Sequence, residues 1–405
     1  MNPVTREDYY WLVSAEAAHF IRQCQTILAS RDANVVSLAK TLRKEISPVR
    51  SAIVMEMAQL RNRARKKFPT ADEMFFTRKG YEQSTSALIA EYKARQFSQF
   101  ERVADICCGI GGDLIELAMR SDDCETIGVD NDHLTCLYAE KNLASVRATG
   151  HADVVESSFA DYNLSGFDAI HIDPDRRAHG RTVQSNFFDP KVEEIFQRVK
   201  TENLAIKVAP ASPTPTDLPD GAECEWIGTR RECKQQVLWC GGTTSRPNSI
   251  TATSIDKDGS VERISIRNDE IDQTVVVATE VGSYIFEPHP CVLAARMTDT
   301  IANRHRLQRL APTVAFLTGG EPLTSSLLTR FKVLRVMPLS LKRVAAELRK
   351  HDVGEIEVKN RGADKILTDQ FSRIKLSGPH RVSILLTRHK RRGLAIIAKR
   401  QKTLT

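Results

Sequence analysis

Long hydrophobic runs are missing from this 405-residue sequence. A transmembrane helix needs about 18 uninterrupted apolar residues, and no stretch of the chain approaches that length. The first ten residues also lack the charged and then apolar pattern of a secretion signal. We therefore expect a cytoplasmic protein that has no membrane partner.

Cysteines in paired spacing are also missing. The chain has nine cysteines, an odd number, and they are scattered apart from the adjacent pair Cys107 and Cys108. Such spacing is typical of neither a disulfide framework nor a zinc site. We expect reduced thiols and no metal ion.

Acidic residues are scarce in the last third of the chain. Residues 283–405 hold 24 Lys and Arg against 9 Asp and Glu, whereas residues 1–282 hold 34 against 42. The formal net charge of +7 conceals this division. Because neutralisation of phosphates by Lys and Arg dominates nucleic-acid affinity, the division favours a nucleic acid or another polyanion as the partner of the C-terminal part.

The chain is long enough for two or three domains, and its pattern changes twice. The first hundred residues predict helices, because Thr5 with Asp8 forms a capping-box pattern and Ser47 with Pro48 forms a cap followed by a first turn. From about residue 101, short apolar runs alternate with amphipathic stretches, which is typical of a largely parallel α/β sheet. We predict strands at Arg102–Ile106, Thr126–Val129, Ala152–Val155, Ala169–Ile172 and Leu204–Val208.

More strands follow this sheet pattern. Residues 225–229 and 236–240 predict a closing pair, and residues 249–267 predict a hairpin with Asp258 and Gly259 at its turn. After residue 283, a strand, a helix, a strand and a final hairpin predict a small basic α+β domain. The predicted organisation is a helical region at 1–98, a Rossmann-like α/β domain at 99–280 and the basic α+β domain at 283–405.

A glycine-rich turn follows the first predicted strand. The segment 103–113, with Gly109, Gly111 and Gly112, runs from an apolar strand into an amphipathic helix. Glycines at this point allow a tight turn and let a ligand approach the backbone, so the segment predicts a nucleotide-like ligand. Asp130 ends the next strand about 20 residues later, where a ribose-binding carboxylate is expected. A nicotinamide site is disfavoured because Leu114 occupies the position of the third glycine.

Residues 101–210 resemble a class I methyltransferase. The resemblance rests on Asp105 four residues before Gly109, on the strand-ending Asp130, and on the pair Asp173 and Pro174. It implies S-adenosylmethionine as cofactor, with its amino-acid end held by Asp105 and the turn and its ribose held by Asp130. The cofactor-binding residues that it implies are Asp105, Cys107, Gly109, Gly111, Asp130, Asn131, Ser158 and Phe159, with Gln83 and Thr85 as a covering segment. Ser84 in that segment could equally be a helix cap.

The segment Asp173-Pro174-Asp175-Arg176-Arg177 ends the fourth predicted strand, at the sheet edge where α/β enzymes place their reaction. Nucleic-acid amino-methyltransferases carry a similar motif in which the acid accepts hydrogens of the target amino group. Asp173 and Pro174 match it, whereas Asp175 and Arg176 replace its second proline and its aromatic residue. We predict Asp173, Pro174, Arg176 and Arg177 as the catalytic residues. Methylation of a pyrimidine carbon is disfavoured, because that route needs a cysteine beside Asp173.

The chain from about residue 75 onward is similar to a bacterial group of methyltransferases with a THUMP-like C-terminal region. The similarity lies in residues 82–85, 107–113, 173–177, 284–288 and 359–362. It implies RNA as partner, and we predict methylation of a base nitrogen of tRNA or rRNA. The predicted RNA-binding residues are Lys342, Arg343, Arg349, Lys359, Arg361, Lys390, Arg391 and Arg392. A methyltransferase of proteins or small molecules, and an inactive RNA-binding protein, stay open as alternatives.

Overall fold

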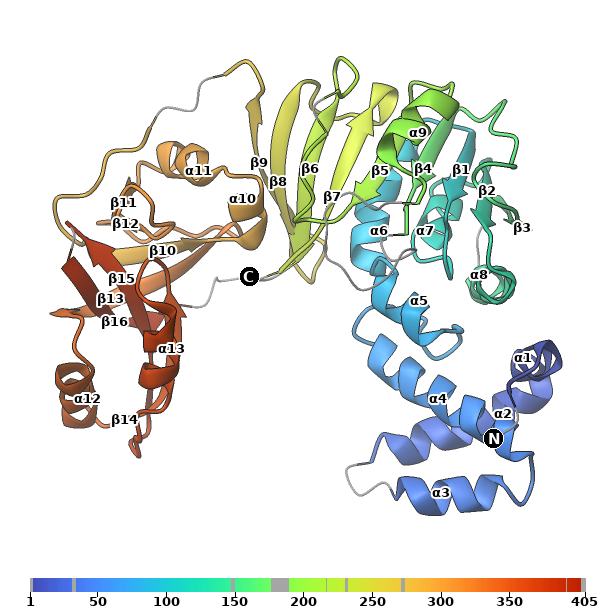
Figure 1. Ribbon diagram of the computed structural model, residues 1–405, viewed down its shortest axis with the longest axis horizontal. Helices are drawn as coiled ribbons and strands as arrows, with labels where there is room; N and C mark the ends of the chain where they lie inside the picture. The colour runs from blue at the N-terminus through green and yellow to red at the C-terminus, as the bar shows by residue number, and fades with distance from the viewer. Residues whose placement is uncertain are drawn as a thin grey trace. The chain divides into compact units, whose positions relative to one another are not determined.

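The computed structural model describes residues 3–30, 34–146, 150–175, 189–215, 217–229, 232–270, 274–390 and 392–401 (Figure 1). The chain divides into two compact units. The first unit comprises Met1–Val208, Ser212–Ala222 and Val237–Ser245, and the second comprises Ala209–Ala211, Glu223–Gln236 and Arg246–Thr405.

Helices make up the first part of the first unit. They are α1 (Arg6–Leu12), α2 (Ala15–Leu28), α3 (Val35–Leu42), α4 (Pro48–Ala64), α5 (Arg78–Gln83), α6 (Ala87–Ala94) and the 3-10 turn η1 (Arg95–Phe97). The predicted capping box of Thr5 and Asp8 is confirmed, and the Ser47 hydroxyl accepts a hydrogen bond from the Arg50 amide at 3.2 Å. The predicted cap at Ser84 is wrong, because Ser84 follows the end of α5 and the residue before α6 is Ser86.

A sheet of nine strands follows in the chain, in the order β3-β2-β1-β4-β5-β7-β6-β8-β9, and its strands β6, β8 and β9 are counted with the second unit. Its strands are β1 (Arg102–Ile106), β2 (Glu125–Asp130), β3 (His151–Glu156), β4 (Ala169–Ile172), β5 (Leu204–Val208), β6 (Glu223–Thr229), β7 (Glu232–Cys240), β8 (Ser249–Ile255) and β9 (Val261–Arg267). Strands β3, β2, β1, β4 and β5 pair in parallel, so their carboxyl ends share one edge. The other helices of this region are α7 (Leu114–Ala118), α8 (His133–Ser145), α9 (Val192–Arg198) and the 3-10 turn η2 (Gly241–Thr243). The Rossmann-like prediction is confirmed, as is the β8–β9 hairpin with Gly259 at φ +84°.

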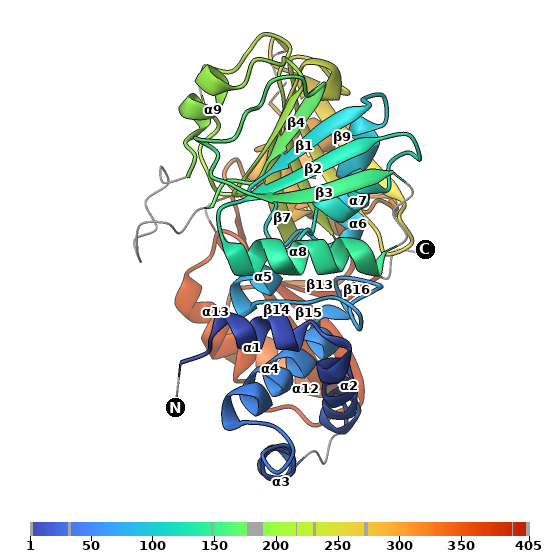
Figure 2. The same cartoon turned by 90° about the vertical axis from the view of Figure 1, so that its right-hand side faces the viewer.

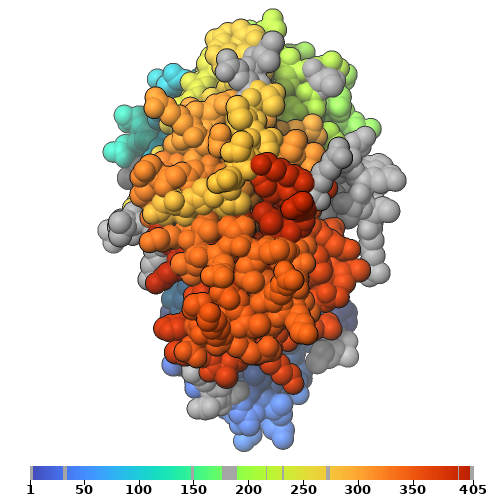
Figure 3. All heavy atoms as spheres, turned by 90° about the vertical axis from the view of Figure 1, so that its left-hand side faces the viewer, coloured from blue at the N-terminus to red at the C-terminus, as the bar shows by residue number. Residues whose placement is uncertain are grey.

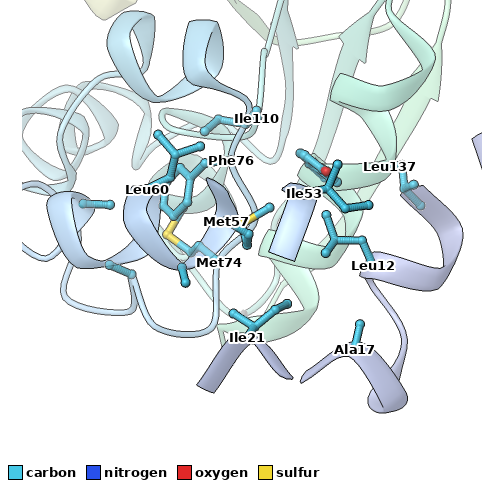
Figure 4. Packing of buried hydrophobic residues seen from close by; sticks show 14 of the residues in the cluster. Leu12, Ala17, Ile21, Ile53, Met57, Leu60, Met74, Phe76, Ile110 and Leu137 are labelled. Atoms are coloured by element: carbon cyan, nitrogen blue, oxygen red, sulfur yellow. The ribbon is translucent and has the colours of Figure 1, made fainter. Parts of the chain in front are cut away.

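The helices at the N-terminus share a hydrophobic core with the glycine loop and with α8. Leu12, Ile53 and Met57 belong to the same buried cluster as Ile110 of the loop and Leu137 of α8 (Figure 4). In Figure 2, α8 lies between the sheet and α1. Because apolar burial is the main stabilising term in folding, the helices and the loop support one another.

The second unit contains a seven-stranded sheet in the order β11-β12-β10-β13-β16-β15-β14. Its strands are β10 (Tyr284–Pro288), β11 (Gln308–Arg309), β12 (Leu317–Gly319), β13 (Leu328–Pro338), β14 (Val353–Asn360), β15 (His380–His389) and β16 (Arg392–Arg400), and its helices are α10 (Pro290–Ala294), α11 (Thr298–Arg304), α12 (Leu341–Lys350) and α13 (Lys365–Ser372). The predicted α+β fold is confirmed. Helix α12 buries Val344, Ala345 and Leu348, whereas Leu341 at its first position is 38% exposed.

Across the described ranges, no helix is long and apolar enough to span a membrane. None of the nine cysteines forms a disulfide within the described ranges.

Candidate active site

The glycine loop after β1 has one open side and one packed side. Gly109 and Gly111 have φ of +58° and +88°, in the left-handed region where side chains are strained. A Cβ atom built on Gly109 meets nothing within 4 Å, so the loop borders open space there. On Gly112 the same atom would lie 3.0 Å from the Ser84 Cβ and 3.1 Å from the Thr85 carbonyl oxygen. The loop can therefore receive a ligand on one side only.

Asp130 at the end of β2 is bonded directly to this loop. Its Oδ2 accepts a hydrogen bond from the Gly109 amide at 3.0 Å, and its Oδ1 accepts one from the Asp132 amide at 3.0 Å. Burial raises the pKa of Asp130, and these backbone bonds oppose the rise. A carboxylate offers about four lone-pair sites, so two bonds to the backbone leave acceptor capacity for a ligand hydroxyl.

Asn142 of α8 holds the loop from its buried side. Its Nδ2 donates to the carbonyl oxygen of Ile110 at 2.8 Å and to that of Phe75 at 3.0 Å. Its Oδ1 accepts from the Phe75 amide at 2.6 Å. One fully buried amide thus connects α8, the loop and the segment that precedes α5.

A network of buried polar and ionisable side chains lies beneath the loop. Asp105 of β1 bonds to His171 of β4 through Oδ1 and Nδ1 at 2.7 Å, and His171 Nε2 lies 3.1 Å from the Lys93 ammonium. Lys93 also pairs with Asp113 at 2.7 Å, and the Thr85 hydroxyl donates to the second oxygen of Asp113 at 2.6 Å. All five residues are buried. The network connects α6 and the predicted covering segment to the loop and to β4.

Burial and ion pairing set the charges of this network. Burial raises the pKa of Asp113, but the Lys93 ammonium and the other nearby cations more than offset this, so the net pKa is well below its usual range. Burial also raises the pKa of Asp105, with His171 opposing it, and Asp105 Oδ2 is buried with no hydrogen-bond partner in the described part of the chain. The Lys93 ammonium therefore favours the charged form of Asp113, and Asp105 has one buried oxygen without a hydrogen-bond partner among the described residues.

Glu116 of α7 is expected to make the protein less stable at pH 7 and above than at acidic pH. Burial, with Glu91 and Asp113 nearby, raises its pKa to about 7 from 4.5. Because the folded state then keeps a proton that the unfolded state loses, stability falls as pH rises from 4.5 to about 7. We expect Glu116→Gln to raise the unfolding free energy by about 1–3 kcal/mol at pH 8 and to have little effect at pH 4. Urea denaturation at both pH values measures this, with Glu140→Gln on the exposed face of α8 as control.

The predicted catalytic motif lies at the carboxyl end of β4. Asp173 Oδ2 is 2.5 Å from the ammonium of Lys207 on β5, and this ammonium also donates to the Gln83 carbonyl oxygen at 3.4 Å. The Gln83 side chain donates to Asp175 Oδ1 at 3.1 Å, and Lys79 pairs with Asp175 Oδ2 at 2.6 Å. Helix α5 therefore contacts the predicted catalytic motif, whereas Gln83 was predicted to cover the cofactor.

The other predicted cofactor-binding and catalytic residues lie after β2, after β3 and after β4. Pro174 is buried beside Asp173, and Asn131 is exposed after β2. The Ser158 hydroxyl donates to Asp161 at 2.6 Å, and the Phe159 ring lies 5.5 Å from the Arg198 guanidinium. Arg176, Arg177 and Arg391 lie outside the described residues.

Lys207 and Lys93 were not among the predicted site residues. Lys207 is a charged residue within the apolar strand Leu204–Val208, and a charge inside such a strand is the sequence feature that could have indicated a site residue. Lys93 gave no such signal, because its partners Asp113 and His171 are distant in sequence. Among the described residues, no group of three or more His, Cys, Asp or Glu side chains could hold a metal ion.

The predicted RNA-binding cations of the second unit differ in their surroundings. Lys359 and Arg361 both pair with Glu287, each at 3.1 Å. The other cations in the described part are exposed, namely Lys342, Arg343, Arg349, Lys390 and Arg392.

Comparisons with known proteins cover nearly the whole chain. A crystal structure of a protein of Porphyromonas gingivalis, described as a putative methyltransferase, matches with a TM-score of 0.73 at 19% identity, covering 96% of this chain and 98% of that one. Two Mycobacterium tuberculosis proteins, described as uncharacterized S-adenosylmethionine-dependent methyltransferases, are 27% identical over 84% of this chain and 93% of their own length. The chain is a class I S-adenosylmethionine-dependent methyltransferase. The predicted enzyme class and cofactor are thereby confirmed.

The methyltransferase also carries a THUMP-like domain. Residues 328–400 match a family described as THUMP domain-like. The match runs from the first residue of β13 to the last residue of β16. The predicted THUMP-like domain is therefore confirmed for these strands and helices.

The observed site fits this cofactor. S-adenosylmethionine carries a ribose with two hydroxyls and an amino-acid end with an ammonium group. The open side of Gly109 gives room for a ligand, and Asp130 has acceptor capacity for hydroxyls. Asp105, the residue before the last of β1, has a buried oxygen without a hydrogen-bond partner among the described residues.

Proposed function

We propose that this methyltransferase methylates a base nitrogen of structured RNA, either tRNA or rRNA. The observation that carries the proposal is the geometry of Asp173. Lys207 fixes its Oδ2, and within the described ranges its Oδ1 has no hydrogen-bond partner. A carboxylate with one oxygen fixed and one oxygen available suits a nucleophile that carries N–H hydrogens.

For the cofactor, we propose that Asp130 accepts hydrogen bonds from the ribose hydroxyls and that the turn at Gly109 and Gly111 lies against the amino-acid end. Asn131, Ser158 and Phe159 would line the adenine, and Thr85 supports the loop through Asp113. When bound, S-adenosylmethionine supplies an electrophilic methyl group. The protein's own task is then mainly to position the nucleophile.

Asp173 performs that positioning in this proposal. Its free oxygen accepts a hydrogen from the target amino group, which orients the nitrogen lone pair and favours loss of the proton during transfer. Asp175 has a different role, because Lys79 and Gln83 occupy both of its oxygens and hold the strand end against α5.

RNA is supported as the substrate by the charge division of the sequence and by the THUMP-like domain. A base within structured RNA must leave its stack to reach a pocket, and a basic auxiliary domain can hold the flanking backbone meanwhile. With RNA as its substrate, the protein is proposed to act in the cytoplasm. We propose on the same grounds that residues 99–280 carry out methyl transfer and that residues 283–405 hold the RNA.

Calorimetric titration with S-adenosylhomocysteine tests the cofactor site. We expect Asp130→Ala to weaken binding by about 10- to 100-fold, because a charged hydrogen bond to the ribose contributes about 1.5–3 kcal/mol. Asp153→Ala, at an exposed position of β3, is the matched control and should leave the affinity unchanged. Equal affinity in the Asp130 variant and the wild type would place the ribose elsewhere.

A second set of experiments separates the substrate classes. Labelled methyl transfer from S-adenosylmethionine is measured with total RNA, total protein and small-molecule extracts from cells that lack the protein. Incorporation into RNA supports the proposal. Incorporation only into protein or small molecules would show that RNA is not the substrate and would identify the class that is. Cofactor binding without transfer, together with RNA binding, identifies an RNA-binding protein that has lost activity.

A further inference from the structure

Two lysines face each other across neighbouring strands of the C-terminal sheet. Lys332 of β13 lies directly opposite Lys399 of β16, and Tyr284 of β10 is the register partner of Lys332 on the other side. Residues that are opposite in an antiparallel pair project from the same face, with Cβ atoms about 4.5–5.5 Å apart. The three residues therefore form one row across three strands, which we call the Lys332 row.

Both lysines are exposed and form no ion pair with a described residue. Neither ammonium has a hydrogen bond or an ion pair with any residue that the structure describes. Other cations of the same unit differ in this respect. Arg335 pairs with Glu347 at 3.1 Å, and Lys359 and Arg361 pair with Glu287. The ammonium groups of Lys332 and Lys399 are thus available to an external anion.

The arrangement is unfavourable for the fold itself. Like charges directly opposite one another destabilise a strand pair, whereas a threonine pair at the same place would be favourable. In the free protein nothing among the described neighbours compensates this repulsion. An anion placed between the two ammonium groups would remove it, and a phosphate of a nucleic-acid backbone has the right charge.

We propose that the Lys332 row is a binding site for the RNA backbone, with Lys332 and Lys399 contacting phosphates. The inference rests on the proposed RNA substrate and names a surface for it that the sequence did not indicate. Figure 3 shows one face of the molecule, on which orange to red atoms of the C-terminal residues form much of the surface. Tyr284 contributes a phenol, partly exposed, at the end of the row.

The double variant Lys332→Thr/Lys399→Thr tests this site. We expect its affinity for mixed tRNA to fall about tenfold, and the slope of log affinity against log salt to decrease by about 2, one for each lost phosphate contact. At the same time its melting temperature should rise, because the repulsion is gone. Fluorescence anisotropy over a salt series and thermal unfolding measure the two effects on the full chain.

The control carries the same change of charge at other places of the same unit. Lys365→Thr/Lys375→Thr removes two exposed lysines that are not cross-strand partners, and it should leave affinity and salt slope nearly unchanged. Equal tRNA binding by the Lys332/Lys399 variant and the wild type, or equal losses in both double variants, overturns the site and leaves the RNA substrate standing. A wild type that binds no RNA, while it binds S-adenosylhomocysteine, overturns both.

Discussion

Replacement of Asp173 by asparagine is expected to lower the rate of methyl transfer to RNA by about 10²–10⁴-fold, the usual contribution of a positioned acid or base. Asparagine keeps the shape and one acceptor oxygen, but it cannot take up a proton and it loses the ion pair with Lys207. Affinity for S-adenosylhomocysteine should change little, because Asp173 is not among the residues proposed to hold the cofactor. Labelled methyl incorporation into total RNA gives the rate, and calorimetry gives the affinity.

Asp168→Asn is the matched control for this experiment. Asp168 immediately precedes β4, so it lies at the opposite end of the strand from Asp173, where it accepts a hydrogen bond from the Arg102 amide at 2.8 Å. We expect wild-type rates from this variant. A full rate in Asp173→Asn would remove the carboxylate from the reaction and shift attention to the residues around it.

Replacement of Lys93 by methionine is expected to lower the free energy of unfolding by about 3–5 kcal/mol, the effect of removing one partner from a buried ion pair. The Lys93 ammonium is 2.7 Å from Asp113 and is fully enclosed. Without it, the Asp113 carboxylate stays buried with only the Thr85 hydroxyl as its partner among the contacts described above. Urea denaturation at pH 7 measures the loss.

A double variant separates the ion pair from packing. Lys93→Met/Asp113→Asn leaves no buried charge in the pair and keeps an acceptor for Thr85, so it should recover part of the lost stability. Because the folded pKa of Asp113 is lowered, the contribution of the pair is present above about pH 4 and declines as the solution becomes more acidic. Lys141→Met on the exposed face of α8 should change stability by less than about 0.5 kcal/mol. A Lys93 variant as stable as this control would show that the pair is unimportant.

The strands of the sheet were predictable, and three of them have the predicted bounds. Arg102–Ile106, Ala169–Ile172 and Leu204–Val208 are buried parallel strands, which read as short apolar runs between turns. Local cap chemistry likewise predicted where α1 and α4 begin. These signals are local, and local signals survive in a single sequence.

The connections between distant residues were not predictable. Nothing in the sequence pairs Lys93 with Asp113 and His171, or Lys207 with Asp173, because these pairs depend on how α6, β4 and β5 assemble. The same holds for the C-terminal cations. Sequence position could not separate Lys359, which Glu287 neutralises, from Lys332, which has no acidic partner among the described residues.

The hydrogen bonds of Asn142 are expected to couple the stability of the glycine loop to that of the helices at the N-terminus. Through this side chain, and through the cluster that joins Ile110 to Leu12 and Ile53, ordering of the glycine loop and ordering of the helices at the N-terminus are parts of one equilibrium. Linkage is reciprocal. A ligand that rigidifies the loop stabilises the helices, and a change that loosens the helices weakens ligand binding by the same free energy. The helices are therefore expected to contribute to cofactor affinity without touching the cofactor.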